Sequence, residues 1–219
     1  MSSPEQLRSL TDVPDHGLGP LGRLAHGVLT ECLAAPPAAP RLYLGHNILP
    51  DPPFPLSGYI AFPAVDDAWR ASGQDLSIFL TWAAESLRAQ PRPSAASFGE
   101  QHQMLNRLLR IDAIALVWEV RVVVPTESMA GWTLAADVLA GRVGREELAD
   151  AAAAEPALAV WTVDRAGSAV LMFAPPGGTA DDIAYAGDLL DSSDPVVARL
   201  ADVLDAQYEW TSAVFGADA

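Results

Sequence analysis

The stretch that decides the fold is IDAIALVWEVRVVV, residues 111–124. Its first half holds an uninterrupted apolar run, residues 113–118, with the length of one buried strand. In its second half the polar residues Glu119 and Arg121 alternate with valines, as they do in a strand with one exposed face. Pro125 then ends the pattern. The sequence therefore predicts a long strand that is buried at its beginning and half-exposed at its end.

Two further patterns follow this strand in the C-terminal half. Residues 157–173 predict a β-hairpin, because two apolar runs flank a turn at residues 164–167. Near the C-terminus, Asp194 is a favourable N-cap residue and Pro195 suits the first position of a helix. An apolar stripe at helical spacing then continues to Phe215, which predicts a long C-terminal helix.

The N-terminal half alternates the same two kinds of element. A helix is predicted over residues 21–34, short strands over 41–44 and 58–62, and a helix over 66–89. The Pro-rich segment 90–95 is the best candidate linker. The predicted fold class is α/β (mixed), with a short mixed sheet flanked by helices and the long C-terminal helix packed on the sheet.

The domain organisation follows from these elements. Residues 1–20 are expected to form a flexible arm, 21–90 an N-terminal α/β subdomain, and 95–219 a C-terminal α/β subdomain. Further helices are predicted at 98–110 and, in the Ala-rich segment, at 128–155. One continuous core shared by the two subdomains is the alternative.

The charged residues exclude several functions. The chain of 219 residues has 13 basic residues, all arginine, against 28 acids, and its net charge is −15. This balance argues against direct binding of nucleic acid or an anionic membrane, since both need clustered cations. Without lysine, neither a P-loop nor a Schiff-base mechanism is available. With neither an evident signal peptide nor an apolar run of membrane-spanning length, a cytoplasmic location is expected.

None of the sequence motifs assembles a cofactor or metal site. Residues 17–22 match G-x-G-x-x-G, but the preceding hydrophobic strand and the later acid of a dinucleotide site are missing. The four histidines have no zinc-binding spacing, and no G-x-S-x-G is present. The single cysteine, Cys32, follows Glu31, a setting that disfavours a reactive thiolate. We therefore expect no cofactor and no metal.

Acidic residues and tryptophans supply the candidate binding residues. Asp181, Asp182, Asp188 and Asp191 crowd one short stretch and predict an acidic surface, with a hard cation held on a helical face as the alternative reading. Among the six tryptophans, Trp132 and Trp210 are the candidates for a surface position, where tryptophan often anchors a binding partner.

Residues 113–215 resemble a known family in the order of their elements. A strand ending in VRVVVP (120–125), a helix, a hairpin with VDR (163–165) and AVL (169–171), and a long helix with Tyr208 and Trp210 follow one another. This order resembles the phospholipase-D-like effector region of winged-helix transcriptional regulators. The catalytic His-x-Lys signature of active phospholipase-D enzymes cannot exist without lysine, and residues 1–110 show no basic recognition helix. The resemblance implies a ligand-sensing or protein-contacting module without hydrolytic activity.

Three functions agree with these observations. The leading hypothesis is a non-enzymatic regulatory or partner-binding protein that uses an acidic, Trp-bearing surface to dock a protein partner or to sense a ligand. The second is a small-molecule enzyme or ligand-binding protein with a pocket near the 45–69 loop, in which His46 would act as general acid or base and Asp51 would be the carboxylate that orients it. The third is an acidic immunity protein or antitoxin. A homodimer is compatible with all three.

Overall fold

The strand predicted at 111–124 lies at the centre of the sheet. β4 (Ile111–Val123) pairs with β2 (Arg41–His46) on one side and with β5 (Ala154–Asp164) on the other. The structure, a computed structural model, describes residues 8–10, 13, 18–47, 58–62, 66–100, 110–123, 154–187 and 194–215.

Within the described ranges, seven strands form one sheet in the order β1-β3-β2-β4-β5-β6-β7. The remaining strands are β1 (Arg8–Ser9), β3 (Gly58–Ala61), β6 (Ala169–Ala174) and β7 (Ala184–Gly187). The α/β class is confirmed. The sheet is larger and more uniform than the short mixed sheet expected, because every pairing between described strands is antiparallel.

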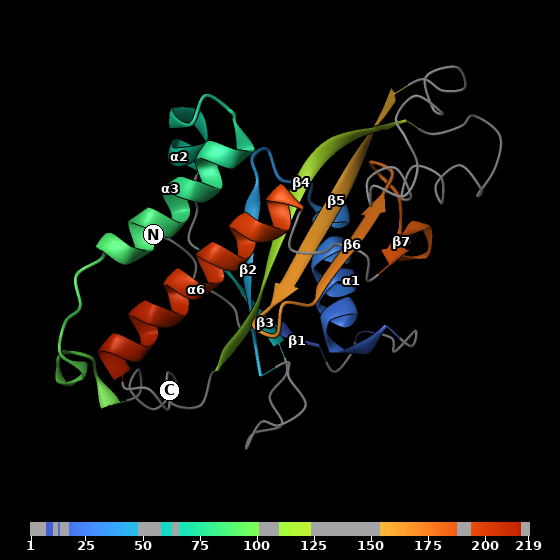
Figure 1. Cartoon of the computed structure of the whole chain (residues 1–219). Helices are drawn as coiled ribbons and strands as arrows, with labels where there is room; N and C mark the ends of the chain where they lie inside the picture. The colour runs from blue at the N-terminus through green and yellow to red at the C-terminus, as the bar shows by residue number, and fades with distance from the viewer. Residues whose placement is uncertain are drawn as a thin grey trace.

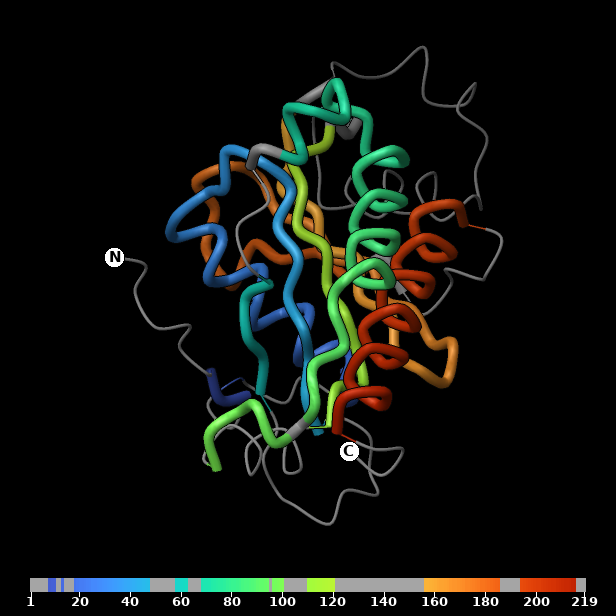
Figure 2. The backbone as a smooth tube through the Cα atoms, turned by 90° about the vertical axis from the view of Figure 1, so that its left-hand side faces the viewer, coloured from blue at the N-terminus to red at the C-terminus, as the bar shows by residue number. Residues whose placement is uncertain are grey.

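Helices cover both faces of this sheet (Figure 1, Figure 2). α1 (Gly19–Ala34) packs on one face, while α3 (Leu76–Ala89) and α6 (Pro195–Phe215) lie side by side on the other. α2 (Asp66–Ala71) contacts α3, and two short 3-10 turns are η1 (Ala95–Ser97) and η3 (Ala180–Asp182). The long C-terminal helix therefore packs on the sheet, as its apolar stripe predicted.

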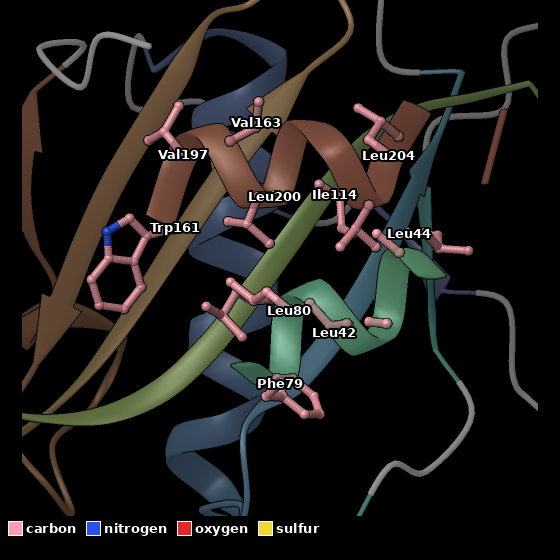
Figure 3. Packing of buried hydrophobic residues seen from close by; sticks show 14 of the residues in the cluster. Leu42, Leu44, Phe79, Leu80, Ile114, Trp161, Val163, Val197, Leu200 and Leu204 are labelled. Atoms are coloured by element: carbon pink, nitrogen blue, oxygen red, sulfur yellow. The ribbon is translucent and has the colours of Figure 1, made fainter. Parts of the chain in front are cut away.

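Alternate residues of β4 belong to two separate cores. Ile114 and Leu116 pack with α3 and α6, whereas Ala113, Ala115 and Val117 pack beneath α1. Figure 3 shows Ile114 among side chains of α3, α6 and β2 on the first of these faces. A strand buried on both faces needs apolar residues at successive positions, which explains the continuous run in the sequence.

The single helix predicted over residues 66–89 is wrong, because the chain forms two helices there. Gly73 and Gln74 have φ angles of 68° and 62°, in the left-handed region that a helix interior does not use. Asp75 then starts α3, its Oδ1 accepting a hydrogen bond of 2.9 Å from the amide of Ile78. Residues 72–75, Ser-Gly-Gln-Asp, include no apolar residue, so the apolar pattern is interrupted at this break.

Strands from the two expected subdomains meet within the sheet through the β2–β4 pairing. Inside the expected N-terminal arm, Arg8 and Ser9 pair with β3, and Leu10 is buried beneath α1. The helices predicted at 98–110 and 128–155 lie outside the described residues except at their ends, where 154–155 belong to β5. The hairpin at 157–173 is confirmed by the β5–β6 pairing.

Replacement of Leu200 by alanine tests this arrangement. Leu200 is fully buried between α6 and the sheet, so we expect Leu200→Ala to lower the free energy of unfolding by about 2–5 kcal/mol in urea titrations. Ala198 lies on the exposed side of the same helix, and Ala198→Ser should change it by less than about 0.5 kcal/mol. Equal effects of the two substitutions would contradict the packing of α6.

Candidate functional site

Helix α6 presents a row of acids to solvent. Its buried residues lie toward the sheet, among them Leu200, Val203 and Leu204. Asp202, Asp205 and Glu209 are all exposed, and their spacing of three and four places them on one side of the helix. The acidic row is therefore the polar half of the same periodicity that buries the apolar half.

Arg88 of α3 partly neutralises this row. Its Nη2 lies 2.6 Å from Asp202 Oδ1 and its Nη1 3.2 Å from Asp202 Oδ2, while Nε is 3.6 Å from Glu209 Oε2. The hydrogen bonds that Arg88 donates to Asp202 raise the pKa of its guanidinium above the ordinary value. Because both partners are exposed, the pair contributes little to stability. Among the described cations, none forms an ion pair with Asp205.

Two large apolar side chains are exposed on α3, the helix that packs beside α6. Ile78 is 56% exposed and Trp82 is 44% exposed, and they stand four residues apart on α3. Together with their N-cap residues, α3 and α6 carry six carboxylates against two arginines. We call the outer surface formed by Ile78, Trp82, Glu85, Asp202, Asp205 and Glu209 the α3–α6 face.

The residues of this face were not among the binding residues predicted from the sequence. The sequence does contain a signal for this face. Ile78 and Trp82 lie on α3 but outside its apolar stripe, which includes Leu76, Phe79 and Leu80. A large apolar residue on the polar side of an amphipathic helix indicates either a second contact within the fold or a binding surface. Only the packing of the helix decides between the two.

The predicted acids Asp181 and Asp182 lie on the other side of the molecule. They belong to η3, which contacts α1, the helix that covers the opposite face of the sheet from α3 and α6. Hydrogen bonds to Asp182 Oδ2 from the Thr179 amide (2.8 Å) and hydroxyl (2.9 Å) lower the pKa of the Asp182 carboxyl.

The helical face considered as a cation site does not form over 181–187, where the 3-10 turn is followed by β7. Asp188 and Asp191 lie outside the described residues. Within the described ranges, no three His, Cys, Asp or Glu side chains form a group able to hold a metal ion.

Trp210 has a place within the fold. Its indole N–H donates to the carbonyl of Pro91 at 3.1 Å, and its ring meets Phe215 edge-on with centroids 6.2 Å apart. Phe215 in turn packs against Phe98, with the ring centroids 5.2 Å apart. Trp210 therefore attaches the segment that leads out of α3 to the C-terminal helix. Trp132 lies outside the described residues.

His46 is the last residue of β2 and not part of a loop, which corrects its predicted setting. It is buried, and its ring lies against Gly58 on β3, where a Cβ atom would come within 2.8 Å of Nε2. A glycine at this position therefore leaves the room that the imidazole occupies. Asp51 lies outside the described residues, so its distance to His46 is not defined.

The residues beside His46 join β2 to the start of β4. Asn47 has a φ of 51°, and its Oδ1 accepts from the Arg110 amide at 2.8 Å while its own amide donates to the Arg110 carbonyl. Arg110 Nε lies 2.7 Å from Oδ1 of Asp112, whose side chain is almost fully buried. These contacts stabilise the sheet end, where the β2–β4 register shifts between Gly45 and His46.

Cys32, on the buried side of α1, lies in a second polar cluster. Its Sγ lies 3.2 Å from the hydroxyl of Tyr43, and burial raises the pKa of both groups. Nearby, the Tyr59 hydroxyl donates to Glu31 Oε2 at 3.1 Å, and Glu31 forms an ion pair with Arg8. The thiol is therefore protonated at neutral pH and unsuited to nucleophilic chemistry.

Comparisons with protein-family models, curated proteins and solved structures find no match to this chain. The resemblance of residues 113–215 to a phospholipase-D-like effector region therefore stays a prediction. In the part of the chain that the structure describes, none of the helices has both the length and the apolar character that a bilayer crossing requires.

The buried hydroxyl and thiol predict a fall of stability in alkali. Unfolded cysteine and tyrosine lose their protons from about pH 9 and 10 upward, while burial keeps Cys32 and Tyr43 protonated in the folded chain. The unfolded state then binds fewer protons, so the free energy of unfolding should fall as pH rises above 9, by up to about 1.4 kcal/mol per pH unit for each group.

Urea titrations at pH 7 to 11 measure this slope. Tyr43→Phe should reduce it, whereas Tyr185→Phe, which removes the hydroxyl of an exposed tyrosine, should leave it unchanged. The same slope in Tyr43→Phe and in the parent protein would show that the buried hydroxyl does not contribute.

Proposed function

We propose that this chain is a non-enzymatic partner-binding protein that docks a positively charged protein through the α3–α6 face. The observation that carries the proposal is the exposure of Trp82 and Ile78 on a helix packed beside an acidic row. Tryptophan is among the residues that most often dominate binding energy when a partner buries them. The proposed place of action is the cytoplasm.

The acids of the α3–α6 face determine the charge of the partner that it attracts. Exposed carboxylates attract a basic protein during diffusion and speed its association, and like-charged proteins are repelled. Asp202 and Glu209 already share Arg88, whereas Asp205 has no such neighbour among the described residues. Asp205 is therefore the carboxylate of this row most available to a cation on the partner.

Rigid support favours binding without a large entropy cost. The inner sides of both helices are tied to the sheet by buried residues such as Phe79, Leu87 and Leu200. A face held in place by a packed core loses little conformational freedom on binding, so more of the contact energy appears as affinity.

Two other hypotheses relate differently to this proposal. An immunity protein or antitoxin would use the same acidic face, and the identity of the basic partner distinguishes that role from a regulatory one. The enzyme hypothesis depends on His46, whose burial at the end of β2 against Gly58 favours a structural role.

Capture of the partner from a native lysate, followed by binding measurements with that purified partner, tests the proposal. Trp82→Ala should weaken binding by about tenfold or more, mainly through faster dissociation. Asp205→Arg should slow association and make the rate less dependent on salt. Both residues are exposed, so the variants should keep the fold and thermal stability of the parent protein.

Asp181→Arg is the matched control, because it introduces the same change of charge at an exposed acid near α1. It should leave binding nearly unchanged. If Asp181→Arg weakens binding while Trp82→Ala and Asp205→Arg do not, the surface predicted from residues 181 and 182 is the docking site and the proposal is wrong. Loss of binding in none of the three variants would also contradict it.

A further inference from the structure

A cavity lies between the first turns of α3 and α6. Its volume is about 360 Å³, and its walls are formed by Leu76 and Leu80 of α3 and by Pro195 and Val196 of α6. Arg199, one turn further along α6, also lines it. A volume of this size falls within the range of roughly 300–1,000 Å³ that small-molecule sites occupy.

Arg199 is a positioned cation beside the apolar part of this cavity, and Gln74, Asp75 and Ser77 also line it. Its Nη1 donates a hydrogen bond to the hydroxyl of Thr81 on α3, which fixes the guanidinium between the two helices. Within the described residues it forms no ion pair. In a chain with 28 acids and 13 arginines, a part-buried arginine that has no carboxylate partner in the described part of the chain is unusual.

The nearest carboxylates have other roles. Asp75, which also lines the cavity, accepts the amide hydrogen of Ile78 at the start of α3. Asp194 accepts from the amides of Val196 at 2.8 Å and Val197 at 3.1 Å at the start of α6. Among the described residues, neither of these carboxylates forms an ion pair with Arg199.

We propose that this cavity binds a small carboxylic acid with an apolar body. The carboxylate would accept hydrogen bonds from the Arg199 guanidinium, and the aliphatic or aromatic body would lie against Leu76, Leu80 and Val196. The site uses neither Trp82 nor the acidic row of α6, so it does not depend on the proposed docking of a basic protein.

The charge of the ligand follows from the chemistry of the walls. An apolar molecule without a charge would bury its surface but leave Arg199 unpaired and desolvated, which costs free energy. A strongly hydrated dianion such as phosphate would pair with the arginine but lose its hydration against four apolar side chains. A monocarboxylate with an apolar body satisfies both parts of the cavity.

Paired acids and amides test the proposal directly. Hexanoate and benzoate are compared with hexanamide and benzamide by ligand-observed NMR and by thermal shift, up to millimolar concentration. We expect binding of at least one acid and at least about tenfold weaker binding of its amide, the factor that one charge-assisted hydrogen bond supplies.

Two variants separate the cavity from the rest of the surface. Arg199→Gln removes the charge but keeps an N–H donor for Thr81, and it should lower the affinity for the acid by about tenfold or more. Arg92→Gln makes the same change at an exposed arginine outside the cavity and should have no effect. Val196→Phe should fill the apolar part and abolish binding while circular dichroism shows an intact fold.

Each remaining outcome overturns the proposal. Equal affinities for an acid and its amide would show that Arg199 does not distinguish the charged ligand from the neutral one. Unchanged binding in Arg199→Gln, or an equal loss in Arg92→Gln, would place the acid elsewhere on the molecule. If none of the four compounds binds to the folded parent protein, the cavity does not serve as a carboxylate site.

Discussion

Burial of β4 on both faces is the constraint on which the rest of the structure depends. Ile114 and Leu116 need a cover on one side and Ala113 and Ala115 need one on the other, so helices must pack on both faces of the sheet. α1 supplies one cover. α3 and α6 supply the other and meet each other as they do so, which creates an outer helical layer (Figure 1).

The outer layer separates stability from binding. The inner sides of α3 and α6 hold the large buried residues, and their outer sides carry Trp82, Ile78 and the acids. The exposed residues contribute little to the core. Substitutions that adapt them to a partner therefore change the free energy of unfolding only slightly. The cavity at the beginning of the layer arises where two capped helix ends meet without filling the space between them.

Much of the fold could be predicted because its signals are local. The run in β4, the hairpin 157–173 and the N-cap pair Asp194–Pro195 each depend on neighbouring residues. The break at Gly73–Gln74 was not predicted, because apolar residues lie at helical spacing on either side of it and the spacing does not show the positive φ angles of these two residues. The position of His46 within β2 was not predicted, because the pairing of β2 with β3 and β4, and not the local proline content, decides where β2 ends.

The sequence by itself determined the acidic balance, the absence of lysine, and the periodicities of β4, β5, β6 and α6. Only the tertiary structure decided which charged and aromatic groups stand together. Arg88 reaches Asp202, and Arg199 reaches Thr81, because α3 and α6 pack side by side on one sheet face. Apolar periodicity determines which side of a helix is buried. Which element packs against that side, and how the two are aligned, depends on how side chains fill the space between them.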